Sequence, residues 1–410
     1  MTGGSRPDPG LPTVPLPLTG VRVIEFGNLV AAPYCGMLLA DLGADVVKVE
    51  PPEGDLARQI GPFINGESAF FMSLNRGKRS MAVDARRVEV RAALRLLCLR
   101  ADVVLHNLRR GAMDRMGLGY QQLAEEGPGL VFTAITAFGG SGPYADRAGI
   151  DLVFQGESGM MSITGAEGEA PHKTATTIGD FVAGTNAAYA ISAALVAKNA
   201  GAPGRLIEIS LRDGLIAVQA GWNAQFFATG VQPRRTGTAS PVTAPNQTLR
   251  TGDGYLNLAV VSDRHFREVC RVLGLEVLVA DPRFGSNELR VANREELAGL
   301  LEEALASASA EHWLALLHRA GVPAGRLLDL AEVFGDAQVL HNEMVVEFDH
   351  PKAGRVRSQG SPIRLDGSTS RSHLRPPLLG EHSQEVLAEA GLSGKLARPF
   401  DEAAVPDRGS

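Results

Sequence analysis

The stretch that decides the fold is residues 21–50, with the sequence VRVIEFGNLVAAPYCGMLLADLGADVVKVE. Residues 21–26 are mostly apolar and β-branched, which predicts a short β-strand. A turn at Gly27 and Asn28 leads into a helix-like run over residues 33–42, and residues 44–50 show a second strand pattern. This strand–helix–strand order with short connections predicts a parallel βαβ unit.

The same alternation continues further along the chain. Residues 80–84, 101–106 and 130–135 are strand candidates, and residues 88–99 and 113–125 have helical patterns between them. Such alternation predicts an α/β fold with a large doubly wound parallel sheet, in which residues 130–135 close the series. Ligands are expected beyond the carboxyl ends of these strands. The connections at that edge are residues 27–32, 51–55, 84–87, 107–112 and 136–143.

With 410 residues, the chain is too long for one ordinary core, so we expect two domains. We assign residues 1–18 to a flexible tail rich in Gly and Pro, and residues 19–229 to the large domain, ending with a strand at 205–209 and a helix at 211–228. Residues 230–346 are expected to form a linker and a smaller α+β domain, with a strand at 255–261 and helices at 263–273, 294–308 and 310–320. Residues 347–410 are then a return segment that completes the large domain and includes a helix at 381–390.

Composition excludes several classes of protein. The net charge of −6 argues against a nucleic-acid-binding protein. Three widely spaced cysteines form neither a disulfide framework nor a zinc motif, and the histidines show no paired ligand spacing, so no metal is expected. We find no signal-peptide pattern, and the most apolar run, residues 185–197, carries too many polar residues for a membrane span. The expected location is the cytoplasm, without a membrane or nucleic-acid partner.

One carboxylate stands out at the start of that apolar run. Residues 177–184, TIGDFVAG, precede a stretch rich in small residues, which predicts a buried helix with Asp180 at or next to its N-terminus. One interpretation is an N-cap, which contributes about 1 kcal/mol. The other is a reactive carboxylate, since a helix N-terminus with free N–H groups favours negative charge. The stretch alone leaves both interpretations open.

Several common enzyme motifs are missing. Glu50 ends the first βαβ unit where an acidic residue would bind a ribose hydroxyl, but the first turn lacks the GxGxxG pattern of nicotinamide enzymes. No P-loop and no GxSxG nucleophile elbow occur. Basic residues do gather near the predicted strand ends, and as a set they suggest an anionic ligand, although each alone is better explained as ordinary solvated surface. They are Lys78, Arg79, Arg86, Arg87, Arg109, Arg110 and Arg115.

Along most of its length the sequence resembles the class III CoA transferases, the CaiB/BaiF family that includes formyl-CoA and carnitine CoA transferases. The resemblance depends on short motifs whose order and spacing extend over more than 300 residues. They are LTGVRVIE at 18–25, LADLGADVVKVE at 39–50, NRGKRS at 75–80, ADVVLHN at 101–107, DRMG at 114–117, DLVFQ at 151–155, IGD at 178–180 and PLLGEH at 377–382.

The resemblance implies CoA transfer between carboxylic acids, with Asp180 as the nucleophile that forms covalent intermediates. It implies no permanently bound cofactor, since the CoA thioester is a substrate, and an interlocked homodimer whose linkers are residues 200–235 and 345–375. Gly179 is expected to leave room for the thioester beside the carboxylate. The implied CoA-binding positions are Val30, Ala31, Val83, Asp84, Ala85, Arg86, Asn107, Leu108, Arg109 and Arg115. Pro51 replaces a residue that is basic in some members, and residues 230–252 contain no match to the family's glycine-rich loop.

Two other functions stay open beside CoA transfer. The related α-methylacyl-CoA racemases use a His as a base at the position of Ile150, so a racemase would lack one of its two proton-transfer groups here. His172, closer to Asp180 in sequence, fits an ordinary loop residue better. The third candidate is a CoA-binding protein without turnover, which would keep the basic residues but would not need Asp180. The acids themselves are not named by the sequence, and their selection is expected in residues 158–175 and 222–250.

Overall fold

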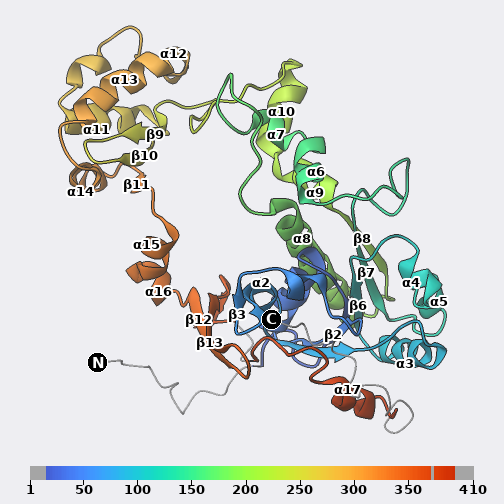
Figure 1. Cartoon of the computed structure of the whole chain (residues 1–410). Helices are drawn as coiled ribbons and strands as arrows, with labels where there is room; N and C mark the ends of the chain where they lie inside the picture. The colour runs from blue at the N-terminus through green and yellow to red at the C-terminus, as the bar shows by residue number, and fades with distance from the viewer. Residues whose placement is uncertain (1–14, 371–373, 393–410) are drawn as a thin grey trace. The chain divides into compact units, whose positions relative to one another are not determined.

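The computed structural model describes residues 15–370 and 374–392 (Figure 1). The chain divides into two compact units, each described here by itself. The large unit comprises residues 1–158, 175–218 and 337–410, and the small unit comprises residues 159–174 and 219–336. Residues 1–14 of the expected flexible tail and residues 371–373 and 393–410 of the expected return segment lie outside the described residues. Leu18, at the end of that tail, is buried, and its N–H donates to the carbonyl of Leu42.

The large unit is built on a six-stranded sheet whose strand pairings are all parallel. In spatial order the strands are β5 (Lys78–Ala82), β2 (Asp45–Glu50), β1 (Arg22–Phe26), β6 (Val103–His106), β7 (Val131–Thr136) and β8 (Leu206–Ser210). From β1 the chain therefore adds strands first on one side and then, from β6 onward, on the other. The predicted α/β fold with a large parallel sheet is confirmed. The prediction that residues 130–135 close the series is wrong, because β8 pairs with β7 as a sixth strand.

Helices cover both faces of this sheet (Figure 1). On one face, α1 (Ala31–Asp41) contacts β1, β2 and β6, and α8 (Ile178–Asn199) contacts β7 and β8. On the other face, α3 (Val88–Leu99), α5 (Tyr120–Ala124) and α17 (Ser383–Glu389) share an apolar core with the strands. That core includes Ile24, Val47, Met81, Leu94, Val104 and Val386.

Some element boundaries differ from the prediction for local reasons. The helix expected over residues 113–125 is broken into α4 (Ala112–Arg115) and α5, because Gly117 adopts a left-handed φ of 75° between them. The helix expected over residues 211–228 is likewise two helices, α9 (Leu211–Val218) and α10 (Ala220–Thr229). Strand β5 begins two residues earlier than predicted, since Lys78 lies in the buried ladder opposite Val46. The helix predicted over residues 88–99 coincides with α3.

The large unit contains further short elements. Between β2 and β5 lie η1 (Leu56–Gln59), β3 (Phe63–Ile64), β4 (Glu67–Ser68) and α2 (Ala69–Leu74), and α6 (Asp151–Glu157) precedes α8. The C-terminal part has α16 (Ala337–His341), β12 (Val345–His350), β13 (Gly354–Gln359), β14 (Arg364–Leu365) and β15 (Ser368–Thr369). Residues 374–392 bind to β5: the N–H of Gly380 donates to Ser80 Oγ, and the N–H of His382 donates to the Ser80 carbonyl.

The small unit has its own antiparallel sheet and core. Strands β9 (Asn246–Arg250), β10 (Tyr255–Ala259) and β11 (Ala324–Arg326) pair in the order β11-β10-β9. The helices are α7 (Met160–Ile163), α10, α11 (Asp263–Leu273), η2 (Glu276–Val279), α12 (Asn287–Ala292), α13 (Arg294–Leu305), α14 (Ala310–Arg319) and α15 (Leu330–Gly335). Leu249, Leu256 and Leu258 alternate inward from the strands and pack on Phe266, Leu301 and Trp313 of the helices.

A layer of charged side chains, all fully buried, lies under α1 on β1, β2 and β5. The Lys48 ammonium donates to Glu25 Oε1 at 3.1 Å and to the Gly27 carbonyl at 2.7 Å, and it forms an ion pair with Asp55 Oδ2 at 2.8 Å. Lys78 is held in the same way, since it donates to the carbonyl of Pro33 and to Asn75 Oδ1 and forms an ion pair with Glu25 Oε2 at 2.9 Å. These buried charges are tolerated because each ammonium is paired with a carboxylate and also donates two hydrogen bonds.

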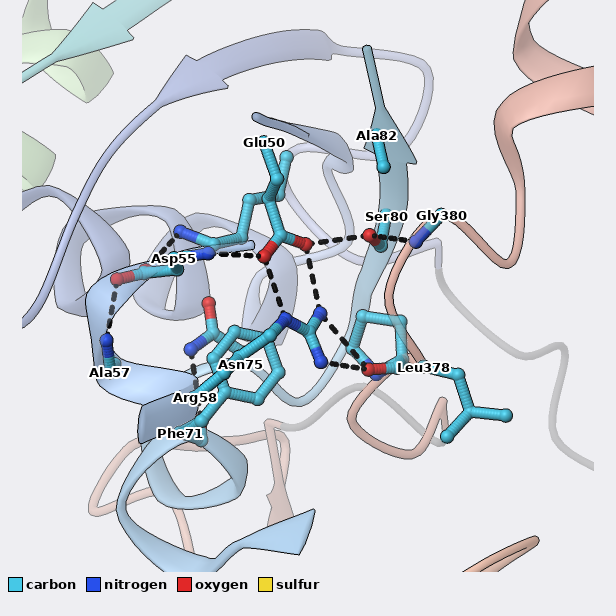
Figure 2. A network of polar contacts seen from close by, with 12 residues as sticks. Glu50, Asp55, Ala57, Arg58, Phe71, Asn75, Ser80, Ala82, Leu378 and Gly380 are labelled. Carbon is cyan, nitrogen blue, oxygen red and sulfur yellow. Dashed lines mark hydrogen bonds and ion pairs between the residues drawn. The ribbon is translucent and has the colours of Figure 1, made fainter. Parts of the chain in front are cut away.

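Glu50 is the centre of a second buried network (Figure 2). Its carboxylate accepts from Arg58 Nε at 2.7 Å, Arg58 Nη2 at 2.8 Å and Ser80 Oγ at 2.6 Å, and the guanidinium of Arg58 lies 3.6 Å from the ring centroid of Phe71. Burial alone would raise the pKa of Glu50, but the hydrogen bonds and charge of Arg58 outweigh it and lower that pKa. The carboxylate is therefore used inside the fold, which removes the ribose-binding interpretation considered for Glu50.

The cysteines, the possible metal-binding groups and the apolar helices are the features that would indicate a metal, a cofactor or a membrane. Cys35, Cys98 and Cys270 are buried free thiols. Within residues 15–370 and 374–392, no group of three or more His, Cys, Asp or Glu side chains is arranged to hold a metal ion. Over the same residues, α8 alone is long and apolar enough to cross a membrane, a test that core helices of soluble proteins also pass. Its contacts with α1, β7, β8 and α9 make it a layer helix of the α/β fold.

The charged layer predicts a large effect of one methyl group. A Cβ added at Gly36 in α1 would lie 2.0 Å from Glu25 Oε2, whereas a Cβ at Gly299 in α13 meets nothing within 4 Å. We expect Gly36→Ala to lower the free energy of unfolding by about 3 kcal/mol, because α1 must move off the ion pairs. Gly299→Ala should instead raise it by about 0.5–1 kcal/mol, as alanine favours a helix interior. Urea unfolding of both variants checks this, and equal midpoints would contradict it.

Candidate functional site

The site lies where the strand order of the large sheet reverses, between β1 and β6. In open α/β sheets, this point leaves a crevice at the carboxyl ends of the strands, where ligands bind. The residues that follow the two strands meet here: Asn107 Oδ1 accepts from the N–H of Asn28 at 2.9 Å, and Asn107 Nδ2 donates to the Asn28 carbonyl at 2.8 Å. The turn after β1 and the end of β6 are thus joined side by side.

The turn after β1 leads into the N-terminus of α1. Val30 is the N-cap residue and α1 begins at Ala31, with no side chain capping the helix. Both residues are buried. Among the described residues, no group accepts the N–H of Ala31 or Ala32, and Pro33 has no N–H to offer. The first turn of α1 therefore presents two backbone donors and the positive end of the helix dipole.

Asp180 lies in the first turn of α8, but it does not cap the helix. Thr177 is the N-cap residue, without a side-chain capping bond. The side chain that does cap α8 is Asp151, at the start of α6: its Oδ1 accepts from the N–H of Gly179 at 2.8 Å, and its Oδ2 accepts from Gln155 Nε2 at 2.5 Å. The N-cap interpretation of Asp180 is therefore wrong, because Asp151, 28 positions before Gly179, takes that role.

The atoms around Gly179 explain why a glycine stands at this position. A Cβ at this position would lie 3.0 Å from Asp151 Oδ1 and 3.3 Å from Leu215 Cδ1. The glycine thus admits the capping carboxylate of Asp151 and the side chain of α9. That Gly179 also leaves room for a thioester stays a prediction.

The Asp180 carboxylate is partly buried and unusually basic. Burial first, and then the negative charge of Asp151, raise the pKa of Asp180 to about 7. Among the described residues, no donor hydrogen-bonds to this carboxylate. At neutral pH, the group is divided between its protonated and charged forms, and its charged form lacks the hydrogen bonds that would make it unreactive.

The starts of α1 and α8 lie against each other. A Cβ at Gly184 would come 2.7 Å from the carbonyl oxygen of Ala31, so glycine permits this close approach. The rings of Tyr34 and Phe181 meet edge to face, with centroids 4.8 Å apart. Because Gly184 is one turn after Asp180, the first turn of α8, which carries the Asp180 carboxylate, lies near the start of α1 in the large unit.

The remaining predicted CoA positions lie at the same edge of the sheet. Val83 is buried directly after β5, and Asp84 forms an exposed ion pair with Arg86 at 2.7 Å, next to Ala85. After β6, Leu108 is half-buried, while Arg109 and Arg115 are exposed and have no ion-pair partner among the described residues. Other members of the basic set are engaged in pairs: Arg87 with Glu89, Arg110 with Asp146, Arg79 with Asp45 and Lys78 with Glu25.

Sequence reasoning missed three residues of this site. Asp151 appeared in a motif but was not recognised as the partner of Gly179, and Asp55 and Lys48 gave no local signal of their contacts with the turn after β1. Both polar atoms of the Asn107 side chain are bound to Asn28, and its contact with CoA stays a prediction. The strand-end position of Asn107 was the one available signal.

Comparison with known proteins identifies the family. The sequence profile described as CoA-transferase family III matches residues 18–383. The chain belongs to this family.

Named relatives agree with the assignment. The chain is 36% identical over 378 residues to the succinyl-CoA:glutarate CoA-transferase of Mus musculus. This alignment covers 91% of this chain and 86% of the mouse protein. It is 37% identical over 391 residues to the succinate–glutarate CoA-transferase of Agrobacterium fabrum, and this alignment covers 93% of this chain and 98% of the bacterial protein. The crystal structure of a CAIB/BAIF family protein from Brucella suis superposes with a TM-score of 0.82 at 38% identity, covering 92% and 100%. The expected resemblance is confirmed, and the protein is a class III CoA-transferase.

The interaction between the charges of Asp151 and Asp180 predicts how kcat/KM of this CoA-transferase depends on pH. Asp151→Asn keeps an oxygen for the N–H of Gly179 but removes the charge that helps to raise the pKa of Asp180. If Asp180 must be ionised to act, kcat/KM of the parent rises with pH through about 7, and in Asp151→Asn this rise moves to lower pH. Profiles of kcat/KM from pH 5.5 to 9 check this, with Asp349→Asn, an exposed substitution in β12, as control. An unmoved or raised midpoint in Asp151→Asn would contradict the coupling.

Proposed function

We propose that the chain moves CoA from an acyl-CoA donor to a carboxylic acid acceptor through covalent intermediates on Asp180. The observation that carries the proposal is the Asp180 carboxylate, which has a pKa of about 7, has no hydrogen-bond donor among the described residues and lies beside the N-terminus of α1. A carboxylate that served only stability would be expected to have bonded partners, as Glu50 and Asp151 do.

In the proposed reaction, the Asp180 carboxylate attacks the thioester carbonyl carbon, and the carbon–sulfur bond breaks. This gives a mixed anhydride on Asp180 and CoA thiolate. The thiolate attacks the Asp180 carbonyl carbon, forms an aspartyl-CoA thioester and releases the donor acid. The acceptor carboxylate then displaces the thiolate to form a second anhydride, and the thiolate takes the acceptor acyl group and frees Asp180. No water is consumed, and each exchange is split into easier steps.

The surroundings of Asp180 suit these steps. Its raised pKa makes the ionised carboxylate a stronger nucleophile than an ordinary surface aspartate. The N–H groups of Ala31 and Ala32, together with the dipole of α1, are suited to stabilise the negative oxygen of each tetrahedral intermediate. Partial burial limits the access of water, which would hydrolyse the anhydride.

The CoA moiety is proposed to occupy the crevice at the end of β1 and β6. Arg109 and Arg115 are the cations available for its phosphates, since both are exposed and neither is engaged in an ion pair among the described residues. Val30, Ala31 and the segment from Val83 to Arg86 line the same edge. Asn107 contributes through the turn that it holds rather than through its amide.

The names of the two relatives support dicarboxylic acids of the succinate and glutarate type as substrates. The names themselves describe only those proteins. The racemase alternative has less support, because Ile150 offers no base at the position that the racemases use. We also propose an interlocked homodimer in the cytoplasm. The exposed apolar side chains Tyr189 and Val196 on α8 are consistent with a covered surface.

Substitution of the nucleophile tests the proposal. Asp180→Asn should lower the rate of CoA transfer at least about a thousandfold, because no covalent intermediate can form. Incubation of the parent with succinyl-CoA, followed by hydroxylamine or borohydride, should leave a modified peptide that contains Asp180, detected by mass spectrometry. Asp349→Asn is the matched control and should keep the parental rate. Transfer at the parental rate in Asp180→Asn would overturn the proposal.

A second prediction concerns the two unpaired arginines. Arg109→Ala and Arg115→Ala should each raise KM for the acyl-CoA about tenfold, with kcat changed less than about twofold, because each removes a phosphate contact that is equally present in ground and transition states. Arg110→Ala, whose parent side chain is paired with Asp146, should leave KM unchanged. Steady-state kinetics with varied acyl-CoA measures all three, and a larger effect in Arg110→Ala would contradict the assignment.

A further inference from the structure

The turn of residues 27–29 between β1 and α1 is fixed more firmly than a connection needs. We propose that Asn107 and Asp55 are positioning residues of the transferase, which hold this turn so that the first turn of α1 keeps its place beside Asp180. The inference rests on the proposed function, because it concerns the rate of the step at Asp180. Neither residue is proposed to touch the reacting atoms.

Leu29 supplies the first observation. Its φ of 62° lies in the left-handed region, which leucine rarely adopts and which glycine adopts freely. The N–H of Leu29 donates to Asp55 Oδ1 at 3.0 Å, and the same oxygen accepts from the N–H of Ala57 at 2.8 Å. The other oxygen, Asp55 Oδ2, pairs with Lys48 at 2.8 Å, and both of these side chains are fully buried. The strained residue is therefore held by a carboxylate that is itself fixed.

The other two residues of the turn have anchors of their own. The carbonyl of Gly27 accepts from Lys48 Nζ at 2.7 Å. Asn28 is bound through both of its backbone polar groups to the side chain of Asn107, across the point where the strand order reverses. The anchors come from β2, from the segment after β2 and from the end of β6, so three separate parts of the chain determine one turn.

We infer that these anchors serve the geometry of the site rather than the stability of the fold. A strained residue persists only where its surroundings determine it, and such residues collect at functional sites. The turn ends at Val30, and the next residue, Ala31, contacts Gly184 one turn after Asp180. If Leu29 relaxed to a right-handed conformation, the start of α1 would shift relative to Asp180, and a shift of about 1 Å can cost a hundredfold in rate.

The first test is Asn107→Ala, which removes both bonds to Asn28. We expect kcat for CoA transfer from succinyl-CoA to fall about 10- to 100-fold, while KM for succinyl-CoA stays within about twofold. Asn293→Ala is the matched control, since Asn293 Nδ2 also makes two bonds to backbone carbonyls, those of Arg283 and Leu289, in the small unit. Thermal unfolding of both variants separates loss of stability from loss of rate. If Asn107→Ala does not fold, Asn107→Asp, which keeps the acceptor for Asn28, is measured instead with the same expectation.

The second test is a rescue that a purely structural role would not give. In the double variant Leu29→Gly with Asn107→Ala, glycine can hold the left-handed turn without the lost anchor, so kcat should recover at least about threefold over Asn107→Ala alone. Leu29→Ala with Asn107→Ala loses the same leucine side chain but keeps the strain, and kcat should not recover.

Three results would overturn the inference. They are a rise in KM with an unchanged kcat in Asn107→Ala, which would mark a direct CoA contact; an equal kcat loss in Asn293→Ala; and equal recovery with glycine and alanine at position 29. Failure of the proposed function is a different result, because it would appear as full activity in Asp180→Asn, whatever the Asn107 variants do.

Discussion

The structure depends on the buried contacts of the Lys48 ammonium with Glu25, Asp55 and the carbonyl of Gly27. Removing either charged partner, Glu25 or Asp55, would leave an uncompensated positive charge in an apolar environment, which costs several kcal/mol. The contacts also link four parts of the chain: β1, β2, the segment after β2 and the turn into α1. Buried ion pairs add little net stability compared with apolar packing, so their value lies in the single geometry they permit.

That geometry explains the neighbouring small residues. Gly36 has no Cβ because the Glu25 carboxylate lies against the helix, and Gly27 has none because Glu25 and Ala32 lie within 2.9 Å of where it would be. The charged layer thus determines how α1 lies on the sheet. Since α1 in turn contacts α8 through Ala31 and Gly184, the position of Asp180 relative to the first turn of α1 depends on ion pairs that contain neither residue.

The sequence predicted what local patterns encode. The alternation of apolar β-branched runs and helical runs predicted the parallel sheet, and α3 was placed at its observed bounds. The sixth strand was not assigned to the sheet, because residues 137–205 separate it from β7 and no local signal says which strand it will pair with. Helices were predicted through Gly117 and Gln219 because apolar periodicity continues across both, while the backbone breaks there.

The site divides in the same way. The prediction of Asp180 came from a motif and a helix start, both of them local, and it remains a prediction about chemistry. The capping role of Asp151 and the anchoring role of Asn107 were not predictable, because each depends on a contact between residues 28 or 79 positions apart. A strand-end asparagine gives the same sequence signal whether its amide meets a ligand or the backbone of the next turn.

Asp151 and Asp180, the two acids near the start of α8, have different roles: Asp151 caps the helix and Asp180 does not. A helix N-terminus offers few N–H groups, and the acid that accepts from them has its oxygen occupied. Here Asp151 takes the N–H of Gly179 and the amide of Gln155, so Asp180 is left without these donors and feels the charge of its neighbour. If Asp180 had capped its own helix, its pKa would have fallen and its oxygens would have been occupied. Gly179, the residue before Asp180, has no Cβ and so lets Asp151 cap the helix. The two residues of the Gly-Asp pair therefore act together: Gly179 admits the Asp151 carboxylate, and Asp180 keeps a raised pKa.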